Sequence, residues 1–219
     1  MRMPGVYRPQ ADTWLLTRAM REAGMPAGAR VLDLGTGSGA LAVAAAAQGA
    51  REVVAVDRSR RAVLCANLNA RVRRLPVRAK RADLLDFRRA RGRFDVVLAN
   101  PPYVPCRPGG ATARTPDRAW DAGPDGRAHL DPLCANAPSL LTARGMLLLV
   151  HSDLCGAEHS LARLRRSGLK ASVVARATVP FGPVLRGRTG YLLESGLIEP
   201  GQDHEELVVI RADRTERPR

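Results

Sequence analysis

The sequence has no long hydrophobic run. Its apolar stretches all fall short of the roughly 18 residues that a membrane-spanning helix needs. The first ten residues, MRMPGVYRPQ, lack the apolar core of a secretory signal peptide. These absences argue against a membrane or secreted protein, and we expect a cytoplasmic one.

Closely spaced cysteines are also missing. Cys65, Cys106, Cys134 and Cys155 lie far apart, so no CxxC spacing indicates a zinc site. A disulfide framework is not expected in a chain of 219 residues. The four histidines show no ligand spacing either. We therefore expect reduced, mostly buried thiols and no structural metal.

Lysine is nearly absent. Lys80 and Lys170 are the only two, and arginine supplies the other basic side chains behind a net charge of +14 and an isoelectric point near 11.2. Such a positive charge is typical of proteins that bind a nucleic acid or the ribosome. Arginine enrichment with abundant alanine also arises from genome base composition, which would leave only a solvated basic surface. Both interpretations stay open.

What the sequence does contain is a repeated alternation of strands and helices. Strands are expected at 30–34, 52–56, 77–82, 95–99, 146–150, 171–179 and 207–212, and helices at 12–23, 39–48, 60–69, 129–141 and 158–167. This alternation predicts an α/β fold with a doubly wound, mostly parallel, seven-stranded sheet. The last two strands have no obvious helix between them, which predicts an antiparallel terminal hairpin.

We expect one domain spanning residues 1–219, because this length and a hydrophobic content of 45% suit a single large core. Residues 1–28 are expected to form an N-terminal helical segment, with Asp12 as the helix cap. The segments 104–127 and 180–206 are rich in glycine and proline and are expected to be long loops, which in compact domains are often functional.

The second of these segments allows two interpretations. It can be a mobile surface loop, or a substrate-selecting lid that presents Arg186, Arg188 and Tyr191 to an acidic or planar partner. The sequence does not decide between them.

A glycine-rich turn separates the first strand from its helix in VLDLGTGSGALAVAAA, residues 31–46. Gly35, Gly37 and Gly39 remove side chains where the backbone must turn tightly and approach a ligand. A phosphate-binding P-loop would need a lysine at its end, and a dinucleotide fingerprint would place its third glycine one residue later. An acid directly before the turn, Asp33, favours a site for S-adenosylmethionine.

Two further acids end the next strands. Asp57 closes VVAVD and can accept both ribose hydroxyls of a nucleoside. Asp83, in RADLL, is placed to accept from an adenine amino group, with Leu84 supplying a backbone contact. Each acid alone is also compatible with a helix cap or a solvated turn. Ligands in such sheets bind at the carboxyl ends of the strands, so the ordered set predicts one adenosine site.

The fourth strand, in FDVVLANPPY, ends in Asn100, Pro101, Pro102 and Tyr103. An amide or exocyclic amine nitrogen is a poor nucleophile because its lone pair is delocalised, and acceptors for its two N–H groups orient it and favour the transition state. The Asn100 side-chain oxygen and the Pro101 carbonyl can be those acceptors, and the prolines stiffen the backbone. Tyr103 offers a flat face for stacking. An ordinary Asn-Pro turn is the alternative, but the neighbouring acids favour methyl transfer to a planar nitrogen.

Together DLGTGSG, VVAVD, RADLL and LANPPY resemble the HemK-type class I S-adenosylmethionine-dependent methyltransferases. These enzymes methylate the side-chain amide nitrogen of glutamine in the Gly-Gly-Gln motif of translation release factors. VYRPQADTWLL (6–16) and AWDAGPDGRAHLDPLC (119–134) are similar to segments of the short HemK branch. The resemblance implies that Thr13 contacts the cofactor, that Asn100 belongs to the cofactor site, and that Asn100 to Tyr103 hold the target amide.

Several functions remain open at this point. A protein glutamine N-methyltransferase acting on a release factor is favoured. A nucleic-acid N-methyltransferase acting on adenine N6 or guanine N2 meets the same lone-pair problem and suits the charge of +14. It would have to flip a duplex base, and no nucleic-acid-binding module is recognisable. A small-molecule N-methyltransferase is also compatible with the sequence. A non-catalytic cofactor-binding protein is a further alternative, but the intact Asn-Pro-Pro-Tyr motif argues against it.

The resemblance also bears on partners. The short HemK branch of eukaryotes and archaea works with a small zinc-binding activator that covers an apolar sheet edge. In this chain the third strand and its approach, RVRRLPVRAKRAD, are studded with arginine. Charge on an edge strand discourages pairing. We therefore expect no obligatory zinc-binding activator.

Overall fold

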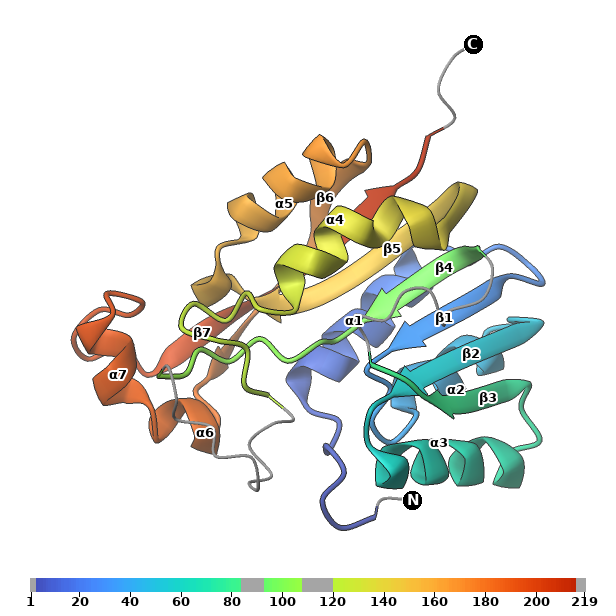
Figure 1. Ribbon diagram of the computed structural model, residues 1–219, viewed down its shortest axis with the longest axis horizontal. Helices are drawn as coiled ribbons and strands as arrows, with labels where there is room; N and C mark the ends of the chain where they lie inside the picture. The colour runs from blue at the N-terminus through green and yellow to red at the C-terminus, as the bar shows by residue number, and fades with distance from the viewer. Residues whose placement is uncertain (1–2, 84–92, 108–119, 216–219) are drawn as a thin grey trace.

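One sheet runs through the molecule with its strands in the order β3-β2-β1-β4-β5-β7-β6 (Figure 1). The computed structural model describes residues 3–83, 93–107 and 120–215. The strands are β1 (Arg30–Leu34), β2 (Glu52–Asp57), β3 (Val77–Arg81), β4 (Phe94–Ala99), β5 (Leu141–Ser152), β6 (Lys170–Pro180) and β7 (His204–Asp213). Strands β1 to β5 are mutually parallel, whereas β7 is antiparallel to both β5 and β6. The predicted fold class and terminal hairpin are confirmed.

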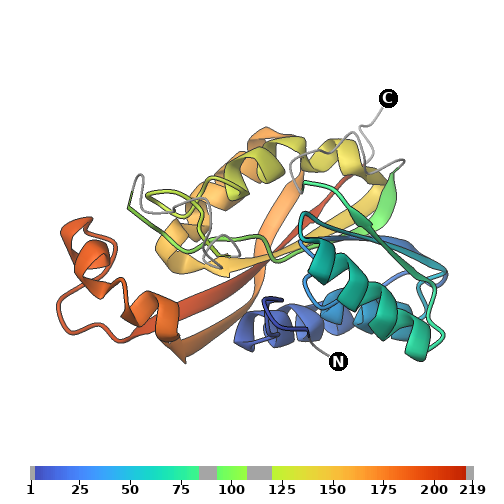
Figure 2. The ribbon, with the colours of Figure 1, turned by 60° about the horizontal axis from the view of Figure 1, so that its bottom comes forward.

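Helices cover both faces of this sheet. They are α1 (Ala11–Glu22), α2 (Ala40–Ala47), α3 (Arg60–Val72), α4 (Leu130–Leu140) and α5 (Ala157–Arg166). Figure 2 shows α1, α2 and α3 on one face and α4 and α5 on the other. Each face carries its own hydrophobic core cluster. Among the described helices none is long and apolar enough to cross a membrane.

Burial explains the sequence of each strand. In β4 the stretch from Val96 to Ala99 is fully buried, because helices cover this central strand on both sides and leave it no polar face. The edge strand β3 instead alternates, with Val77 and Ala79 buried and its basic side chains exposed. Parallel pairing brings the carboxyl ends of β1 to β4 to one edge of the sheet.

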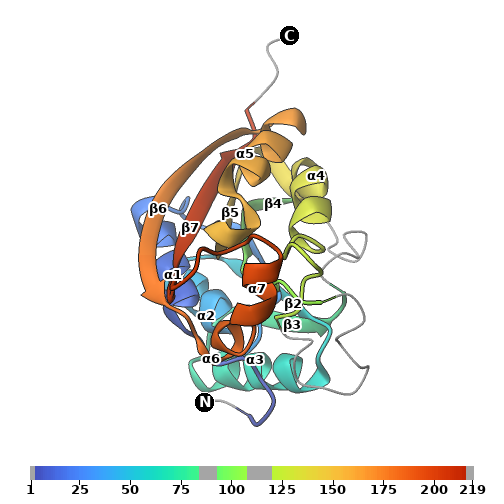
Figure 3. The same cartoon turned by 90° about the vertical axis from the view of Figure 1, so that its left-hand side faces the viewer.

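The segment 180–206 is not simply a loop, which corrects the expectation from the sequence. It contains two short helices, α6 (Pro183–Arg186) and α7 (Thr189–Glu194). Figure 3 views the molecule from the end at which these helices stand in front of the sheet. Phe181, Leu185, Leu192 and Ile198 form a small core of their own. Burial of these side chains makes the segment an ordered insertion between β6 and β7.

The segment 104–127 has no helix or long strand in its described parts, 104–107 and 120–127, as expected. The two parts are joined by backbone hydrogen bonds. The Val104 N–H donates to the Trp120 carbonyl (2.8 Å), and the Cys106 N–H donates to the Gly123 carbonyl (2.9 Å). The residues that follow the motif are therefore held against those that lead into α4.

This segment and the α6–α7 insertion are also tied to one another. The Arg188 guanidinium donates to the Pro105 carbonyl (3.0 Å) and pairs with Asp121. The Tyr191 hydroxyl donates to the Pro124 carbonyl (2.8 Å). Arg188 and Tyr191, which the lid hypothesis left free for a partner, are thus engaged within the protein, and the insertion is fixed beside the segment that follows Tyr103.

Candidate active site

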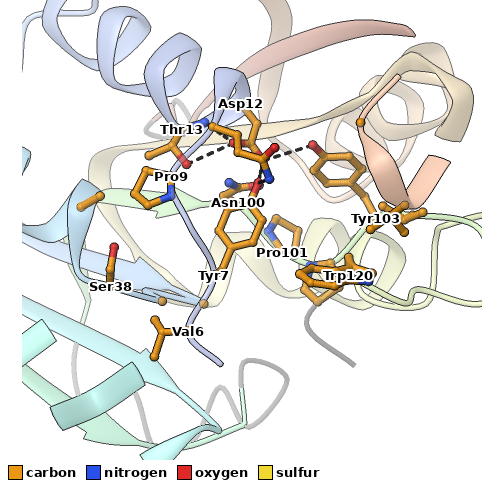
Figure 4. A pocket seen from close by; sticks show the side chains of 18 of the residues that line it. Val6, Tyr7, Pro9, Asp12, Thr13, Ser38, Asn100, Pro101, Tyr103 and Trp120 are labelled. Atoms are coloured by element: carbon orange, nitrogen blue, oxygen red, sulfur yellow. Dashed lines mark hydrogen bonds between the residues drawn. The ribbon is translucent and has the colours of Figure 1, made fainter. Parts of the chain in front are cut away.

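A pocket of about 560 Å³ opens at the carboxyl ends of β1 to β4 and continues toward the start of β7 (Figure 4). The predicted site residues that line it are Thr13, Gly35, Gly37, Asp57, Asp83, Asn100, Pro101, Pro102 and Tyr103. Two others, Asp33 and Gly39, do not line the pocket. Leu84 lies outside the described residues. The sheet therefore brings Asp57, Asp83 and the motif into one cavity, of a size usual for a small-molecule site.

The glycine loop is shaped for close approach. Gly35 and Gly37 both have positive φ angles, of 74° and 54°. A Cβ atom on Gly35 would lie 3.5 Å from the Asn100 carbonyl oxygen. The Gly37 N–H donates to Asp57 Oδ2 at 2.9 Å. A side chain in this loop would fill the space between the cofactor side and the motif, which explains the glycines.

Asp33 holds the loop from behind. Its Oδ2 accepts the Thr36 hydroxyl (2.6 Å) and the Ala42 N–H (3.1 Å). The carboxylate is fully buried, and this burial raises its pKa to about 7. Gly39 also acts indirectly: a Cβ atom there would lie 2.9 Å from Ala66 of α3. Both residues support the loop and the packing of α2 rather than contacting a ligand in the pocket.

Asp57 is poised at the end of β2. Its Oδ1 accepts the Ser59 N–H (2.8 Å) and its Oδ2 accepts the Gly37 N–H. Burial raises the pKa of this carboxyl, while the two backbone bonds favour its ionised form. Each oxygen keeps a further lone pair, so the pair of oxygens can accept two hydroxyls.

The motif is anchored by its backbone and leaves its amide available. Among the described residues none hydrogen-bonds to the Asn100 side chain. The Tyr103 carbonyl accepts the Cys155 thiol at 3.0 Å. Gly126, with a φ of 75°, packs against the same carbonyl, and a Cβ atom there would overlap it and lie 2.6 Å from Cys155 Sγ. These contacts fix the course of the chain at the end of the motif.

Sequence reasoning missed several pocket residues, of which the most informative are Tyr7, Asp12, Trp120 and Glu205. Asp12 is not the cap of α1, because the cap position is Gln10 and the Asp12 side chain is buried in the pocket wall. The Tyr7 and Trp120 rings lie 6.3 Å apart at 60°. Aromatic residues make up only 4% of the chain, so their scarcity was a signal that each one present could have a specific role.

Glu205 adds a second buried carboxylate to this end of the pocket. It is 7% exposed, and its Oε2 has no hydrogen-bond partner among the described residues. Burial raises its pKa, and the charge of Asp12 adds to the effect. No group of three or more His, Cys, Asp or Glu side chains that could hold a metal ion occurs in the described parts of the chain.

The strand order, a glycine loop after β1, an acid at or just past the end of each of β1 to β3 and a ligand-sized pocket at the strand ends are the features of a class I methyltransferase. The sequence model of the methyltransferase small domain matches residues 4–113. The chain belongs to this family and, within it, to the HemK-type methyltransferases.

Two relatives illustrate the match. A candidate protein N5-glutamine methyltransferase of Methanocaldococcus jannaschii is 33% identical over 81% of this chain and 88% of its own length. The release factor glutamine methyltransferase of Deinococcus radiodurans is 39% identical over 77% of this chain. The chain spans only 61% of the length of that second relative.

A solved structure shares the fold. The Mtq2–Trm112 complex of E. cuniculi, described as responsible for methylation of the termination factor eRF1, contains a chain that superimposes with a TM-score of 0.67. The alignment covers 96% of this chain and 99% of that chain, at 24% sequence identity. At this identity the likeness concerns the fold alone.

Proposed function

We propose that this protein is an S-adenosylmethionine-dependent methyltransferase that modifies the side-chain amide nitrogen of a glutamine in a translation release factor. The observation that carries the proposal is the position of Asn100 to Tyr103, which follow β4 and line the same pocket as Asp57 and the glycine loop. The names of the relatives from Methanocaldococcus and Deinococcus support the choice of glutamine.

The residues present fit the proposed cofactor. The glycine loop leaves room where a Cβ atom would meet Asn100 or Tyr7. Asp57 keeps lone pairs for the ribose hydroxyls, and Asp83 stands after β3, on the side expected for adenine. Thr13 lines the pocket close to the motif. When bound, S-adenosylmethionine supplies an electrophilic methyl group on a sulfonium.

The protein's own contribution is to hold the acceptor. The Asn100 side-chain oxygen and the Pro101 carbonyl accept the two N–H groups of the target amide, so the nitrogen is oriented and its electron density is raised in the transition state. The rigid proline pair keeps these acceptors in place. Tyr103 stacks on the planar amide. No strong base is required, because the nitrogen becomes acidic once it is methylated and releases its proton to water.

A nucleic-acid acceptor is the second candidate, favoured by the net charge of +14. The charge distribution in the pocket argues against it. Its motif end carries the carboxylates Asp12 and Glu205, and the only arginine or lysine among the described lining residues is Arg58, next to Asp57. Phosphates beside a flipped base would meet acids rather than cations. A neutral peptide backbone meets no such repulsion.

The test is direct. The purified protein is incubated with radiolabelled methyl donor and, in separate reactions, a release factor, total RNA, DNA and a small-molecule extract. We expect label on the release factor, and mass spectrometry should place it on the glutamine of its Gly-Gly-Gln motif. A release factor with that glutamine replaced by alanine is the matched control. Label confined to RNA, DNA or small molecules would overturn the proposal.

We further expect the reaction to take place in the cytoplasm, where release factors act, and without an obligatory zinc-binding activator. Support for the second point comes from β3, whose exposed side chains Arg78, Lys80 and Arg81 are all basic. An edge strand of this kind resists pairing with another strand. A release factor, the expected substrate, is then the one protein partner that turnover requires.

A further inference from the structure

The Asp12 carboxylate joins three separate segments of the pocket wall. Its Oδ2 accepts the Tyr7 hydroxyl at 2.7 Å and the Tyr103 hydroxyl at 3.2 Å. Its Oδ1 accepts the backbone N–H and, at 3.1 Å, the hydroxyl of Thr13. In Figure 4 the two tyrosines point toward Asp12 from two sides, and dashed lines mark these bonds. One side chain thus connects the cofactor side of the pocket to the catalytic motif.

Burial of Asp12 favours the hydrogen bonds that its carboxylate accepts. Asp12 is 4% exposed, and a buried carboxylate needs donors to replace its water. Burial raises the pKa of both Tyr7 and Tyr103, and the charge of Asp12 raises each further. Both hydroxyls therefore stay protonated, and able to donate, at neutral pH. The donors outnumber the oxygens, so the carboxylate is well satisfied before any ligand binds.

Tyr103 gains an orientation from this contact. Its carbonyl is held by Cys155 at one end of the residue, and its hydroxyl is held by Asp12 at the other. A ring fixed at both ends presents one face in one direction. A ring held only at its backbone could rotate about its side-chain torsions and would lose part of its stacking on an acceptor.

We propose that Asp12 is a positioning residue for the methyl acceptor: its carboxylate fixes the Tyr103 ring as a platform for the acceptor and couples that ring to Thr13. The inference rests on the proposed function, because the platform matters only if an acceptor stacks on it. Asp12 touches no reacting atom in this account and acts through Tyr103.

A purely structural role for Asp12 would have a different signature. It would lower stability and the amount of folded enzyme, but the enzyme that folds would keep its KM for the acceptor. The substitution Tyr103→Phe separates the two roles, because it keeps the ring and its packing and removes only the hydroxyl bound to Asp12. The substitution Asp12→Asn removes the charge with little change of shape.

The experiment is a double-mutant cycle on the full chain, with a release factor as acceptor. Tyr103→Phe, Asp12→Asn and the double variant are compared with the unaltered protein for acceptor KM, kcat and calorimetric affinity for S-adenosylhomocysteine. Thermal unfolding of each variant reports the folded fraction. Tyr7→Phe is the matched control, because it removes a hydroxyl from the same carboxylate without touching the motif.

For Tyr103→Phe we expect the acceptor KM to rise about tenfold, with kcat lowered less than about threefold, as fits the loss of a hydrogen bond to a charged group. Affinity for S-adenosylhomocysteine should stay within about twofold of normal by the same reasoning, because the cofactor side is intact. The double variant should have an acceptor KM no higher than Asp12→Asn alone, because both changes remove one link. Tyr7→Phe should raise this KM less than Tyr103→Phe does.

Additive effects of the two changes, or an acceptor KM unchanged in Tyr103→Phe, would overturn the inference while leaving the proposed function standing. If Asp12→Asn does not fold, Tyr103→Phe and Tyr7→Phe still decide the matter. Absence of release-factor methylation by the unaltered protein would be a separate result: the proposed function fails, and the inference falls with it.

Discussion

At the scale of single residues, the Asn100 amide is the group on which the proposed chemistry depends most. Its side chain takes no hydrogen bond from the described residues, yet the backbone that follows it is held by the bond from the Cys155 thiol to the Tyr103 carbonyl. Free acceptors on a rigid backbone are what preorganised catalysis requires. In the proposed mechanism the Pro101 carbonyl is the second acceptor, and Tyr103 holds the plane of the target amide.

Asn100→Ala should lower kcat about 100-fold or more, since removal of one preorganised transition-state contact commonly has this effect. Affinity for S-adenosylmethionine, measured by calorimetry, should change little. Asn136→Ala is the control, because Asn136 is an exposed asparagine on α4 whose amide only contacts the Pro132 carbonyl. Near-normal turnover by Asn100→Ala would contradict the mechanism.

Gly126 offers a second residue-level prediction. Gly126→Ala places a methyl group onto the Tyr103 carbonyl and Cys155 Sγ, so the motif must shift. We expect turnover to fall at least tenfold, because small misplacements of catalytic groups are costly. Gly28→Ala is matched in backbone strain, with a φ of 66° and open space around its Cβ position. It should cost about 1 kcal/mol of stability and leave turnover unchanged. Equal activities of the two variants would show that the packing of Gly126 against the Tyr103 carbonyl does not position the motif.

Asp33 predicts a pH effect on stability. The pKa of an unfolded aspartate is about 3.9, and the folded value of Asp33 is about 7. Between these values the folded state binds the extra proton, so the residue favours folding at low pH and this benefit is lost as the pH rises through about 7. Asp33→Asn keeps the acceptor for Thr36 and Ala42 but cannot ionise.

The melting temperature of Asp33→Asn, relative to the unaltered protein, should therefore increase from pH 5 to pH 8 in calorimetry. A difference that is the same at both pH values would show that Asp33 titrates normally in the folded protein.

The sequence predicted most of the candidate site, because acids at strand ends and glycines at tight turns follow from chain order. It could not predict the role of Asp12. A carboxylate at the start of a helix has the same local pattern whether it caps the helix or binds a tyrosine 91 residues away. Only the packing of α1 against β5, β6 and β7 brings the two together.

At the scale of elements, the α6–α7 insertion is the feature that most distinguishes the motif end of the pocket. Gly182, Pro183, Val184 and Leu185 line that end directly. The insertion in turn contacts the segment 104–127 through Arg188 and Tyr191. It is therefore placed to limit which acceptors can reach Tyr103.

Arg188→Ala should loosen this wall. We expect a loss of about 1–3 kcal/mol of stability, because a largely buried guanidinium with a charged partner is removed, and a higher KM for the release factor with unchanged affinity for S-adenosylmethionine. Arg186→Ala, at an exposed position of α6, is the control and should leave both constants near normal. A normal KM in Arg188→Ala would mean that the insertion does not shape the acceptor site.

Element prediction succeeded where one physical signal dominated. The first strand was predicted with its observed bounds, Arg30–Leu34, because a mostly apolar run flanked by turns has one interpretation in an α/β chain. The helices α6 and α7 are four and six residues long, too short to show a helical period among prolines and glycines. Their burial comes from contacts with each other and with distant residues.

At the scale of the whole molecule, charge and apolar surface must be considered together. Beside the basic edge strand β3, helix α3 exposes Leu64, Leu68 and Val72, which are 57%, 38% and 65% exposed. These side chains recur every four residues and so form a stripe on one side of the helix. The basic side chains of β3 argue against a protein partner at this edge of the sheet, whereas the exposed apolar stripe on α3 would suit such a partner.

We expect the protein purified alone to give a single species in light scattering. We also expect it to methylate a release factor at a rate that added cell extract does not increase. Leu68→Arg combined with Val72→Arg should leave that rate unchanged, because no partner is needed on this face. A zinc-containing subunit that co-purifies in equal amount, and whose loss in the double variant abolishes activity, would overturn the expectation.

The position of β7 has a consequence for how the molecule is made. This strand is the last of the described elements in sequence, yet it lies between β5 and β6 and brings Glu205 and Leu207 to the pocket. When the nascent chain has emerged only as far as β6, this strand has nothing to pair with, because its neighbour in the sheet is β7. The strands β1 to β5 can pair as they emerge, but the acceptor end of the pocket closes only when residues 204–213 have also emerged from the ribosome. Catalytic competence should therefore appear only after β7 has been synthesised and has paired with β5 and β6.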